Sequence, residues 1–251
     1  MEERGKECDV PQEINCKRNE KEQEKDISHA SHVLESLWQI YMEQKLCDVT
    51  LAVGDDEVRA HRLVLAANSP YFYTMFTSGL SECSSQRILL KEVDFKAVQL
   101  LIEYCYTSFI HLDEMNVESL LKTAHLLQFN SIVKTCCIFM TSQLDPTNCL
   151  GISSLAEFHG CTDLQTGALN YARKHFCKVA TTEEFFVAPF TQIMDLLSSD
   201  SLNVPSEKDT FDIAMSWVKH DLENRQEFLA QMLSSIRLVL LPPKVLGELH
   251  V

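Results

Sequence analysis

Two patterns of apolar and polar residues follow one another along the chain, and they predict a mixed first half and a helical second half. Between Ser31 and about Glu43 apolar residues recur at every third or fourth position, which predicts an amphipathic helix. Residues 47–53 are rich in β-branched side chains and predict a strand. Residues 54–56 have turn chemistry, so residues 57–60 are expected to pair back on that strand as a hairpin.

Short helices and short strands are predicted to alternate as far as the middle of the chain. Ser69 and Pro70 mark a helix start, because proline is favoured in a first turn, and Gly79 marks the end of that helix. Asp94 and Asn116 stand in capping positions before two further amphipathic helices. The predicted helices are residues 61–67, 69–79, 94–105, 116–127 and 132–143, and the predicted strands are residues 87–90 and 109–110.

Beyond Asp145 and Pro146 the pattern is helical throughout. Because the residue before a proline is steered out of helical space, this dipeptide marks a domain boundary. Predicted helices lie near residues 148–159, 163–177, 182–187, 190–198, 207–221 and 225–235. A length of 251 residues is comfortable for two domains. We therefore expect an α+β domain over residues 28–143, with helices around a small sheet, followed by an all-α domain over residues 144–251.

Residues 1–27 have a different composition from the rest of the chain. They hold six basic and nine acidic residues with only scattered apolar ones. Such a segment cannot bury enough apolar surface to offset its ordering entropy, which predicts a disordered charged tail. A charged ligand for another protein is the alternative interpretation.

The charge and the apolar runs of the sequence argue against nucleic-acid and membrane partners. The net charge is -14, from 22 basic and 36 acidic residues, whereas phosphate binding depends on clustered Lys and Arg. No apolar run approaches the ~18 residues that a membrane span needs. The N-terminal residues MEERGKECDV are charged where a secretory signal would be apolar. We expect a protein of the cytoplasm or nucleus with neither a nucleic-acid nor a membrane partner.

Candidate chemistry is scarce in the sequence. The ten cysteines are expected to be reduced thiols, because the chain lacks an export signal. There is no C-x-x-C pair, and the adjacent Cys136 and Cys137 diverge by about 100° on a helix, so neither a zinc site nor a redox pair is expected. Nucleotide-binding glycine motifs and a G-x-S-x-G elbow are missing. We expect no cofactor and no metal, and the sequence offers no constellation that an enzyme would need.

Two sets of motifs indicate a family that the sequence resembles. The first half contains Cys47-Asp48-Val49-Thr50, Ala60-His61-Arg62, Leu65-Ala66-Ala67, Ser69-Pro70-Tyr71-Phe72 and Met75-Phe76. These motifs resemble those of the BTB (POZ) domain. The second half contains QLDPTNCLGI at residues 143–152, then Ala156-Glu157, Tyr171-Ala172 and Trp217. This half is similar to the BACK domain that follows BTB in Kelch-like proteins, and the resemblance covers about residues 30–250.

One feature of Kelch-like proteins has no counterpart in this sequence. Those proteins usually continue into a β-propeller whose repeats of about 50 residues carry paired glycines. This chain has no Gly-Gly pair and stops at Val251. We expect either a fragment or a natural short form, in which the usual substrate-binding part is missing, so that the substrate cannot be named.

The resemblance implies a two-fold dimer in which the first helix packs across the axis. Val33, Leu37 and Ile40 are the residues expected at this interface. The helix follows a charged tail and has a wide apolar stripe to bury, as obligate interfaces do. The alternative is that the stripe packs within its own subunit.

The resemblance also implies a contact with cullin-3. Cullin-binding members carry a hydrophobic-x-Glu triplet after the Pro-Tyr-Phe helix, and Leu80, Ser81 and Glu82 stand at that position here. An exposed leucine can fill a partner pocket while the carboxylate accepts hydrogen bonds beside it. The helix pair that begins near Asn148 would form the second wall of the groove. The alternative is that Leu80 folds back onto the core.

Asp48, His61 and Arg62 are expected to form a charged pocket, because the resemblance places such residues near the dimer axis. Asp48 begins an apolar strand, where a buried carboxylate would need a partner, and His61 or Arg62 could supply it. The cluster is either a partner-recognition pocket or a structural ion pair.

These expectations together predict a non-catalytic substrate adaptor that recruits cullin-3 to a ubiquitin ligase as a homodimer. The alternatives are a cullin-independent scaffold for transcriptional or cytoskeletal partners, and an enzyme. A short form could in addition inhibit full-length relatives by dimerising with them.

Overall fold

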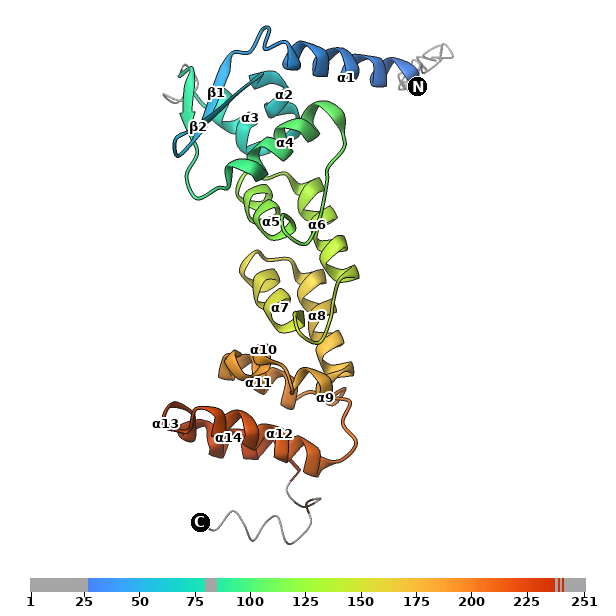
Figure 1. The fold of residues 1–251 in the computed structure, drawn as a ribbon, viewed down its shortest axis with the longest axis vertical. Helices are drawn as coiled ribbons and strands as arrows, with labels where there is room; N and C mark the ends of the chain where they lie inside the picture. The colour runs from blue at the N-terminus through green and yellow to red at the C-terminus, as the bar shows by residue number, and fades with distance from the viewer. Residues whose placement is uncertain (1–26, 80–84, 238, 240, 242–251) are drawn as a thin grey trace, which may run out of the picture.

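The computed structural model describes residues 27–79, 85–237, 239 and 241. A small sheet wrapped by helices forms one end of an elongated molecule, and pairs of helices are stacked from there to the C-terminal end (Figure 1). The predicted α+β unit followed by an all-helical unit is confirmed.

The sheet contains β1 (Val49–Val53), β2 (Asp56–Ala60) and β3 (Arg87–Leu89) in the order β2-β1-β3. β1 pairs with β2 as the predicted antiparallel hairpin and with β3 in parallel. Leu51, in the central strand, is fully buried, and it faces Val58 on one side and Ile88 on the other. Gly54 supports the tight turn between β1 and β2 with a φ of 60°, a left-handed conformation that glycine adopts without strain.

Six helices complete the first unit within the described residues. Their bounds are α1 (Ile27–Met42), α2 (Arg62–Asn68), α3 (Pro70–Thr77), α4 (Phe95–Thr107), α5 (Val117–Leu126) and α6 (Asn130–Ser142). The Ser69 hydroxyl accepts a hydrogen bond from the backbone N–H of Phe72 and so caps α3, as predicted. The Asp94 carboxylate does the same for α4 through the N–H of Ala97, at 2.8 Å. Each cap satisfies a backbone donor that the first helical turn leaves without a partner.

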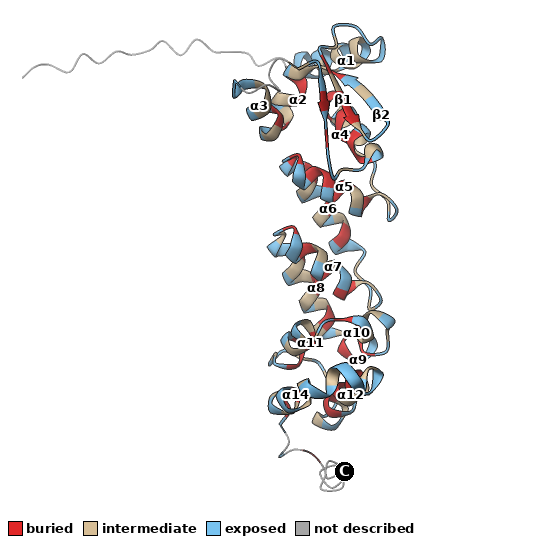
Figure 2. Cartoon of the chain, turned by 90° about the vertical axis from the view of Figure 1, so that its left-hand side faces the viewer, coloured by how far each residue is buried: buried red, intermediate tan, exposed pale blue. Residues whose placement is uncertain are grey.

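The second unit is built entirely of helices in the described part of the chain. They are α7 (Cys149–Phe158), α8 (Thr162–Lys174), α9 (Phe176–Val179), α10 (Glu183–Val187), α11 (Phe190–Leu197), α12 (Glu207–His220), α13 (Leu222–Arg225), the 3₁₀ turn η2 (Gln226–Phe228) and α14 (Leu229–Ser235). Their core surrounds Trp217, whose indole N–H donates to the carbonyl oxygen of Ala188. Buried residues line the inner faces of the stacked helices from one end of the molecule to the other (Figure 2).

Two predicted elements differ from the structure. The strand expected at residues 109–110 is absent, and Phe109 is 83% exposed. Its backbone N–H donates to the hydroxyl of Thr107 instead of to a neighbouring strand. The helix expected over residues 225–235 is divided into the end of α13, η2 and α14.

The last helix pair of the first unit and the first pair of the second unit repeat one another. α5 and α7 each have 10 residues, and α6 and α8 each have 13. α7 begins as many residues after α5 as α8 begins after α6. The turn inside each pair contains a residue with positive φ, Gln128 at 56° and Gly160 at 65°. A Leu-Asp-x-x-Asn sequence precedes both pairs.

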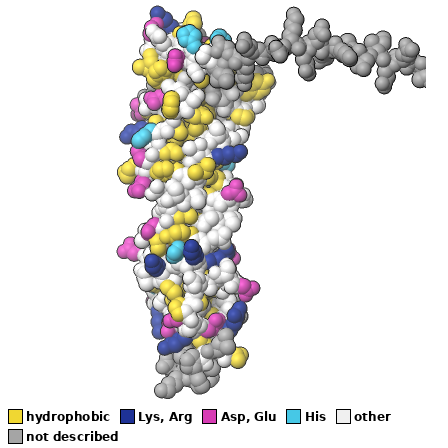
Figure 3. Space-filling model, turned by 90° about the vertical axis from the view of Figure 1, so that its right-hand side faces the viewer, with side chains coloured by type: hydrophobic (Ala, Val, Ile, Leu, Met, Phe, Trp, Pro, Cys, Tyr) yellow, Lys and Arg dark blue, Asp and Glu magenta, His cyan; other side chains and the backbone are white. Residues whose placement is uncertain are grey.

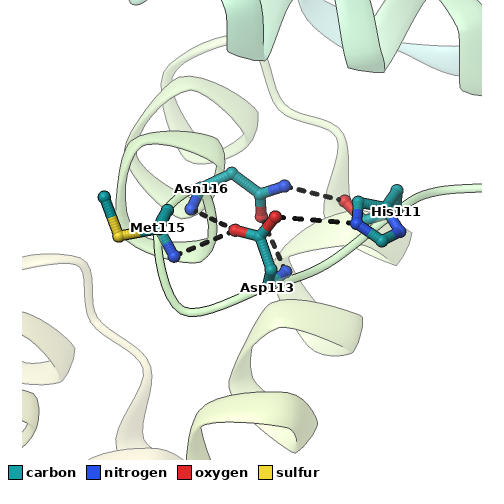
Figure 4. A network of polar contacts seen from close by, with 4 residues as sticks. All are labelled: His111, Asp113, Met115 and Asn116. Carbon is teal, nitrogen blue, oxygen red and sulfur yellow. Dashed lines mark hydrogen bonds and ion pairs between the residues drawn. The ribbon is translucent and has the colours of Figure 1, made fainter.

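The first of these Leu-Asp-x-x-Asn loops explains why Asn116 does not cap α5 as predicted (Figure 4). The Asn116 side chain accepts from the backbone N–H of Asp113 and donates to the carbonyl oxygen of His111, both at 3.1 Å. The Asp113 carboxylate accepts from the N–H groups of Met115 and Asn116. The aspartate therefore binds the orphan donors before the helix, and the asparagine closes the loop.

The second loop repeats three of these four bonds. The Asp145 N–H donates to the Asn148 side-chain oxygen at 2.8 Å, and the Asn148 amide donates to the carbonyl oxygen of Gln143 at 2.9 Å. The Asp145 carboxylate accepts from the N–H and the hydroxyl of Thr147, and the N–H bond is the larger cause of the lowered pKa of Asp145. The two helix pairs are thus started by one repeated hydrogen-bonded loop.

Candidate partner-binding surfaces

The first candidate surface is α1, which extends away from the body of the molecule (Figure 1). Its inner side packs on the core through Leu37, Trp38 and Tyr41. The Tyr41 ring stacks on the buried Tyr106 ring with centroids 4.6 Å apart. Part of the apolar stripe therefore lies within its own subunit, which is the alternative that the sequence left open for Leu37.

The remaining apolar residues of α1 are less covered. Val33 is 41% exposed, and Ile40 is half-buried without belonging to the core cluster of the described residues. Leu63 on α2 is 80% exposed. Within the described residues, Val33 and Ile40 of α1 and Leu63 of α2 are therefore at least partly exposed to solvent.

Asp48 and Arg62 line one hollow of about 540 Å³, together with Leu63 and Tyr73. The expectation that Asp48 is buried is wrong, because the residue precedes β1 and is exposed. Its carboxylate accepts a hydrogen bond from the backbone N–H of Arg62 at 2.8 Å, at the start of α2. The Arg62 guanidinium donates to the carbonyl oxygens of Asp48 and Ser85. These bonds join the residue before β1, the start of α2 and Ser85, two residues before β3.

Arg62 and His61 make further contacts that hold this corner of the fold. The Arg62 guanidinium carbon lies 4.9 Å from the centroid of the Phe76 ring, a cation–π contact. The two ring nitrogens of His61 lie 2.8 Å from the Tyr106 hydroxyl and 2.8 Å from the carbonyl oxygen of Lys45. The Lys45 carbonyl requires a proton on Nε2, so Nδ1 accepts from the tyrosine hydroxyl. His61 therefore links the core to the segment after α1.

The predicted Leu80-Ser81-Glu82 triplet lies outside the described residues. The chain leads into it from α3 through Gly79, which has a φ of 74°. α3, α5 and α7 follow one another along one side of the molecule (Figure 2). Each of these three helices carries an exposed large apolar residue: Tyr73 at 59%, Leu126 at 43% and Phe158 at 83%.

Leu126 and Phe158 were not predicted as site residues. They occupy equivalent positions at the C-terminal ends of α5 and α7, in the repeated helix pairs. The repeated Leu-Asp-x-x-Asn sequence is the signal that could have identified them. Hydrophobic side chains also occur at intervals along the length of the face drawn in Figure 3.

Comparison with known proteins gives matches to two families. Residues 38–144 match the BTB/POZ domain, and residues 149–250 match the family described as BTB And C-terminal Kelch, or BACK. The chain belongs to the BTB–BACK family.

The BTB–BACK chain is also similar to several Kelch-like proteins. It is 44% identical to Kelch-like protein 2 of Homo sapiens over 220 residues, which are 88% of this chain and 37% of that protein. It is 46% identical to Kelch-like protein 17 of Mus musculus over 196 residues, which are 78% of this chain and 31% of that protein. For Kelch-like protein 28 of Homo sapiens the identity is 43% over 222 residues, 88% of this chain and 39% of that protein. The chain therefore spans less than half the length of these relatives.

The BACK part of the structure contains a contact that sequence reasoning missed. Glu184, at the start of α10, accepts from the backbone N–H groups of Leu150 and Gly151 in the first turn of α7, both at 3.2 Å. Burial raises the pKa of Glu184, and these two bonds oppose the rise. A Cβ atom at position 151 would stand 2.5 Å from the Glu184 carboxylate, so glycine permits the approach. The two hydrogen bonds of Glu184 fix the position of α7 relative to α10.

Across residues 27–79 and 85–237, no group of three or more His, Cys, Asp or Glu side chains could hold a metal ion. No helix in the same part of the chain is long and apolar enough to cross a bilayer.

Proposed function

We propose that this BTB–BACK chain is a non-catalytic adaptor that binds cullin-3 and places a ubiquitin-transfer complex near a substrate. The observation that carries the proposal is the succession of α3, α5 and α7 along one side of the molecule, each with an exposed large apolar residue. The Leu80-Ser81-Glu82 triplet follows α3 in the sequence. The adaptor acts by effective concentration, because holding two proteins together converts their encounter into an intramolecular event. Bond chemistry is supplied by enzymes that the cullin carries.

The cullin-binding surface is proposed to run from the triplet across α5 to α7. Leu80 supplies the apolar anchor and Glu82 the carboxylate, as the resemblance to cullin-binding relatives implies. Leu126 and Phe158 extend the apolar row onto the repeated helix pairs. Anchors of this kind dominate binding energy when they fill a partner pocket, whereas the surrounding contacts mainly exclude water.

The charged cluster of Asp48, His61 and Arg62 is proposed to be structural. Its polar atoms are hydrogen-bonded to the backbone just before β1, at the start of α2, after α1 and before β3, and to the buried Tyr106. Removing one of these partners would leave others without a bond, so the cluster supports the fold in the described part of the chain.

The protein is further proposed to act as a homodimer through α1 in the cytoplasm or nucleus. Val33 and Ile40 provide the apolar surface that the subunit itself leaves partly uncovered. Two-fold dimers use the same patch on both subunits, which suits a single protruding helix.

The adaptor proposal is tested by calorimetric titration of the chain with the N-terminal domain of cullin-3. A Leu80→Asp, Glu82→Lys double variant should weaken binding by roughly 100-fold, the effect of losing about 2–3 kcal/mol at an anchor. A Phe158→Asp variant tests the second wall of the surface. The matched control is Val187→Asp with Glu223→Lys, which makes the same changes at exposed positions on α10 and α13.

Each outcome of this titration has a definite meaning. Binding that is lost in the double variant and kept in the control supports both the function and the surface. Binding that survives in the double variant keeps the function and contradicts the site. A chain that does not bind cullin-3 at all overturns the adaptor proposal in favour of a cullin-independent scaffold.

A further inference from the structure

The repeated helix pairs enclose a hollow of about 720 Å³ that the adaptor proposal does not use. α6 and the turn between α7 and α8 line it from the two units. The side chains with reactive or titratable groups on its wall are those of His125, Lys134, Cys137, His159, Cys161 and Asp163. The hollow therefore brings chemistry from separate parts of the sequence into one place.

Two thiols meet in this hollow. The Cys161 thiol is within hydrogen-bonding reach of the Cys137 thiol, and both side chains are half-buried and free of disulfides. The sequence suggested no redox pair, because the adjacent Cys136 and Cys137 diverge by about 100° on a helix. In the structure Cys136 is fully buried in the core. The partner of Cys137 comes instead from the next helix pair.

The Cys161 thiol also donates to the carbonyl oxygen of His159 at 3.8 Å, and the His159 ring lines the same hollow. Among the described residues neither ring nitrogen of His159 has a hydrogen-bond partner, although the residue is only 8% exposed. Its ring lies 5.1 Å from the His125 ring, centroid to centroid. Burial, followed by the charge of His125, lowers the pKa of His159, so the ring is neutral at physiological pH. The described groups here do not form a metal site.

We propose that Cys137 and Cys161 form a reversible disulfide when the protein meets a peroxide. The Cys161 thiolate attacks the peroxide oxygen, the O–O bond breaks, and a sulfenic acid and an alcohol or water are produced. The Cys137 sulfur then attacks the sulfenic sulfur, the S–O bond breaks, and a water molecule leaves as the disulfide forms. In total two thiols and one peroxide become one disulfide, one alcohol or water, and one further water.

The assignment of the two roles follows from their positions. We assign the first attack to Cys161, the residue before the first turn of α8. Burial, and then the neighbouring Cys161, raises the pKa of Cys137 to about 12, which makes Cys137 the poorer nucleophile for the first attack. Both residues line the same hollow, and a disulfide requires their sulfurs to approach to about 2 Å.

The disulfide would join the last helix of the BTB part to the first helix pair of the BACK part. α6 and α8 already contact one another. A covalent link here would restrain the orientation of the two domains and raise the melting temperature of the oxidised protein above that of the reduced protein.

The test is a titration of the whole chain with hydrogen peroxide after reduction and treatment with a zinc chelator. Digestion with trypsin and a glutamate-specific protease separates the two cysteines, because Glu157 lies between them. We expect a cross-linked peptide pair that is lighter than the two reduced peptides by the mass of two hydrogen atoms and that dithiothreitol separates again. A Cys137→Ser variant should lose the cross-link and leave Cys161 as a sulfenic acid that dimedone traps.

A Cys177→Ser variant is the control, because Cys177 is exposed on α9 and should not affect the cross-link. A cross-link that persists in Cys137→Ser would assign the partner to Cys136 or Cys149 and overturn the proposal. The proposal is also overturned if peroxide oxidises the Cys177 thiol before it oxidises the pair. It is overturned as well if Cys161 of the wild-type chain is oxidised without forming any cross-link. Stoichiometric zinc that is present before chelation, absent from Cys137→Ser and retained in Cys177→Ser would show that the two thiols hold a metal ion and would overturn the disulfide.

Discussion

Arg225 joins three parts of the BACK core through one side chain. Its guanidinium carbon lies 3.9 Å from the Trp217 ring centroid, and its terminal nitrogens donate to the carbonyl oxygens of Trp217 at 2.8 Å and Phe186 at 2.6 Å. We expect Arg225→Ala to lower the free energy of unfolding by roughly 2–4 kcal/mol, because two carbonyls lose their donors and the ring loses its cation. Urea unfolding measures this change.

The control for Arg225 is Arg237→Ala. Arg237 pairs with Asp200 at 3.3 Å, but both side chains are largely exposed. Exposed pairs of this kind contribute about 0–1 kcal/mol. If Arg225→Ala and Arg237→Ala lower the free energy of unfolding equally, the stacking and the carbonyl hydrogen bonds of Arg225 contribute little to stability.

Glu184 gives a pH-dependent prediction. Its pKa in the fold is raised above the ordinary value of 4.5, chiefly by burial, so the folded state binds the proton more tightly than the unfolded state. The stability that this proton provides is complete below the unfolded pKa and is lost as the pH rises through the folded pKa. The free energy of unfolding of the wild type, minus that of Glu184→Gln, should therefore decrease as the pH rises across this window.

Urea titrations at several pH values between about 4 and 8 measure this difference, in which the other carboxylates cancel. Gly151→Ala provides a second measurement at neutral pH, because its Cβ would meet the Glu184 carboxylate at 2.5 Å and weaken the link between α7 and α10. A difference that is constant with pH would mean that Glu184 keeps its ordinary pKa in the fold.

The two Leu-Asp-x-x-Asn loops are expected to respond alike to mutation. Asn116→Ala and Asn148→Ala each remove an amide that accepts from one backbone N–H and donates to one carbonyl. The free energy of unfolding should fall by about 1–2 kcal/mol in each variant, because two backbone groups lose their hydrogen-bond partner. Thermal unfolding measures both, with Asn130→Ala as the control at an exposed position at the start of α6. Strongly different losses would contradict the structural equivalence of the two loops.

Helices were predictable where local rules decide them, as at Ser69 and Asp94, whose side chains cap the helices that follow. The predicted strand at Phe109 was wrong because a strand requires a neighbour, and apolar residues in sequence do not supply one. Asn116 was assigned to a cap from its residue type alone. Its bonds go to the preceding loop because Asp113 already binds the first donors, a competition that single-residue preferences do not reveal.

The arrangement of the whole chain was predictable as a BTB unit followed by a BACK unit, because motifs in both halves occur in the family's order. Contacts between segments that are distant in the sequence were not predictable. The approach of Cys161 to Cys137 and of Glu184 to Gly151 depends on how helix pairs stack, which the periodicity of each helix leaves open. The exposed position of Asp48 likewise follows from where β1 begins.

The dimer proposal predicts that charges on the outer side of α1 separate the subunits without unfolding them. Leu37 is unsuitable for this test because it packs on its own core, whereas Val33 and Ile40 do not belong to that core in the described chain. Val33→Asp with Ile40→Asp should weaken dimerisation by at least roughly 100-fold, since two carboxylates would have to be buried at an apolar interface.

Sedimentation velocity at micromolar concentration distinguishes the outcomes. We expect the wild type and an Ile138→Asp control, whose side chain is 72% exposed on α6, to sediment as dimers, and the double variant to sediment as a monomer with unchanged helix content. A wild type that is monomeric would overturn the proposal and would leave the exposed Val33 to a different partner. A dimer that persists in the double variant would move the interface away from α1, and Leu63 on α2, 80% exposed, would then be the next position to test.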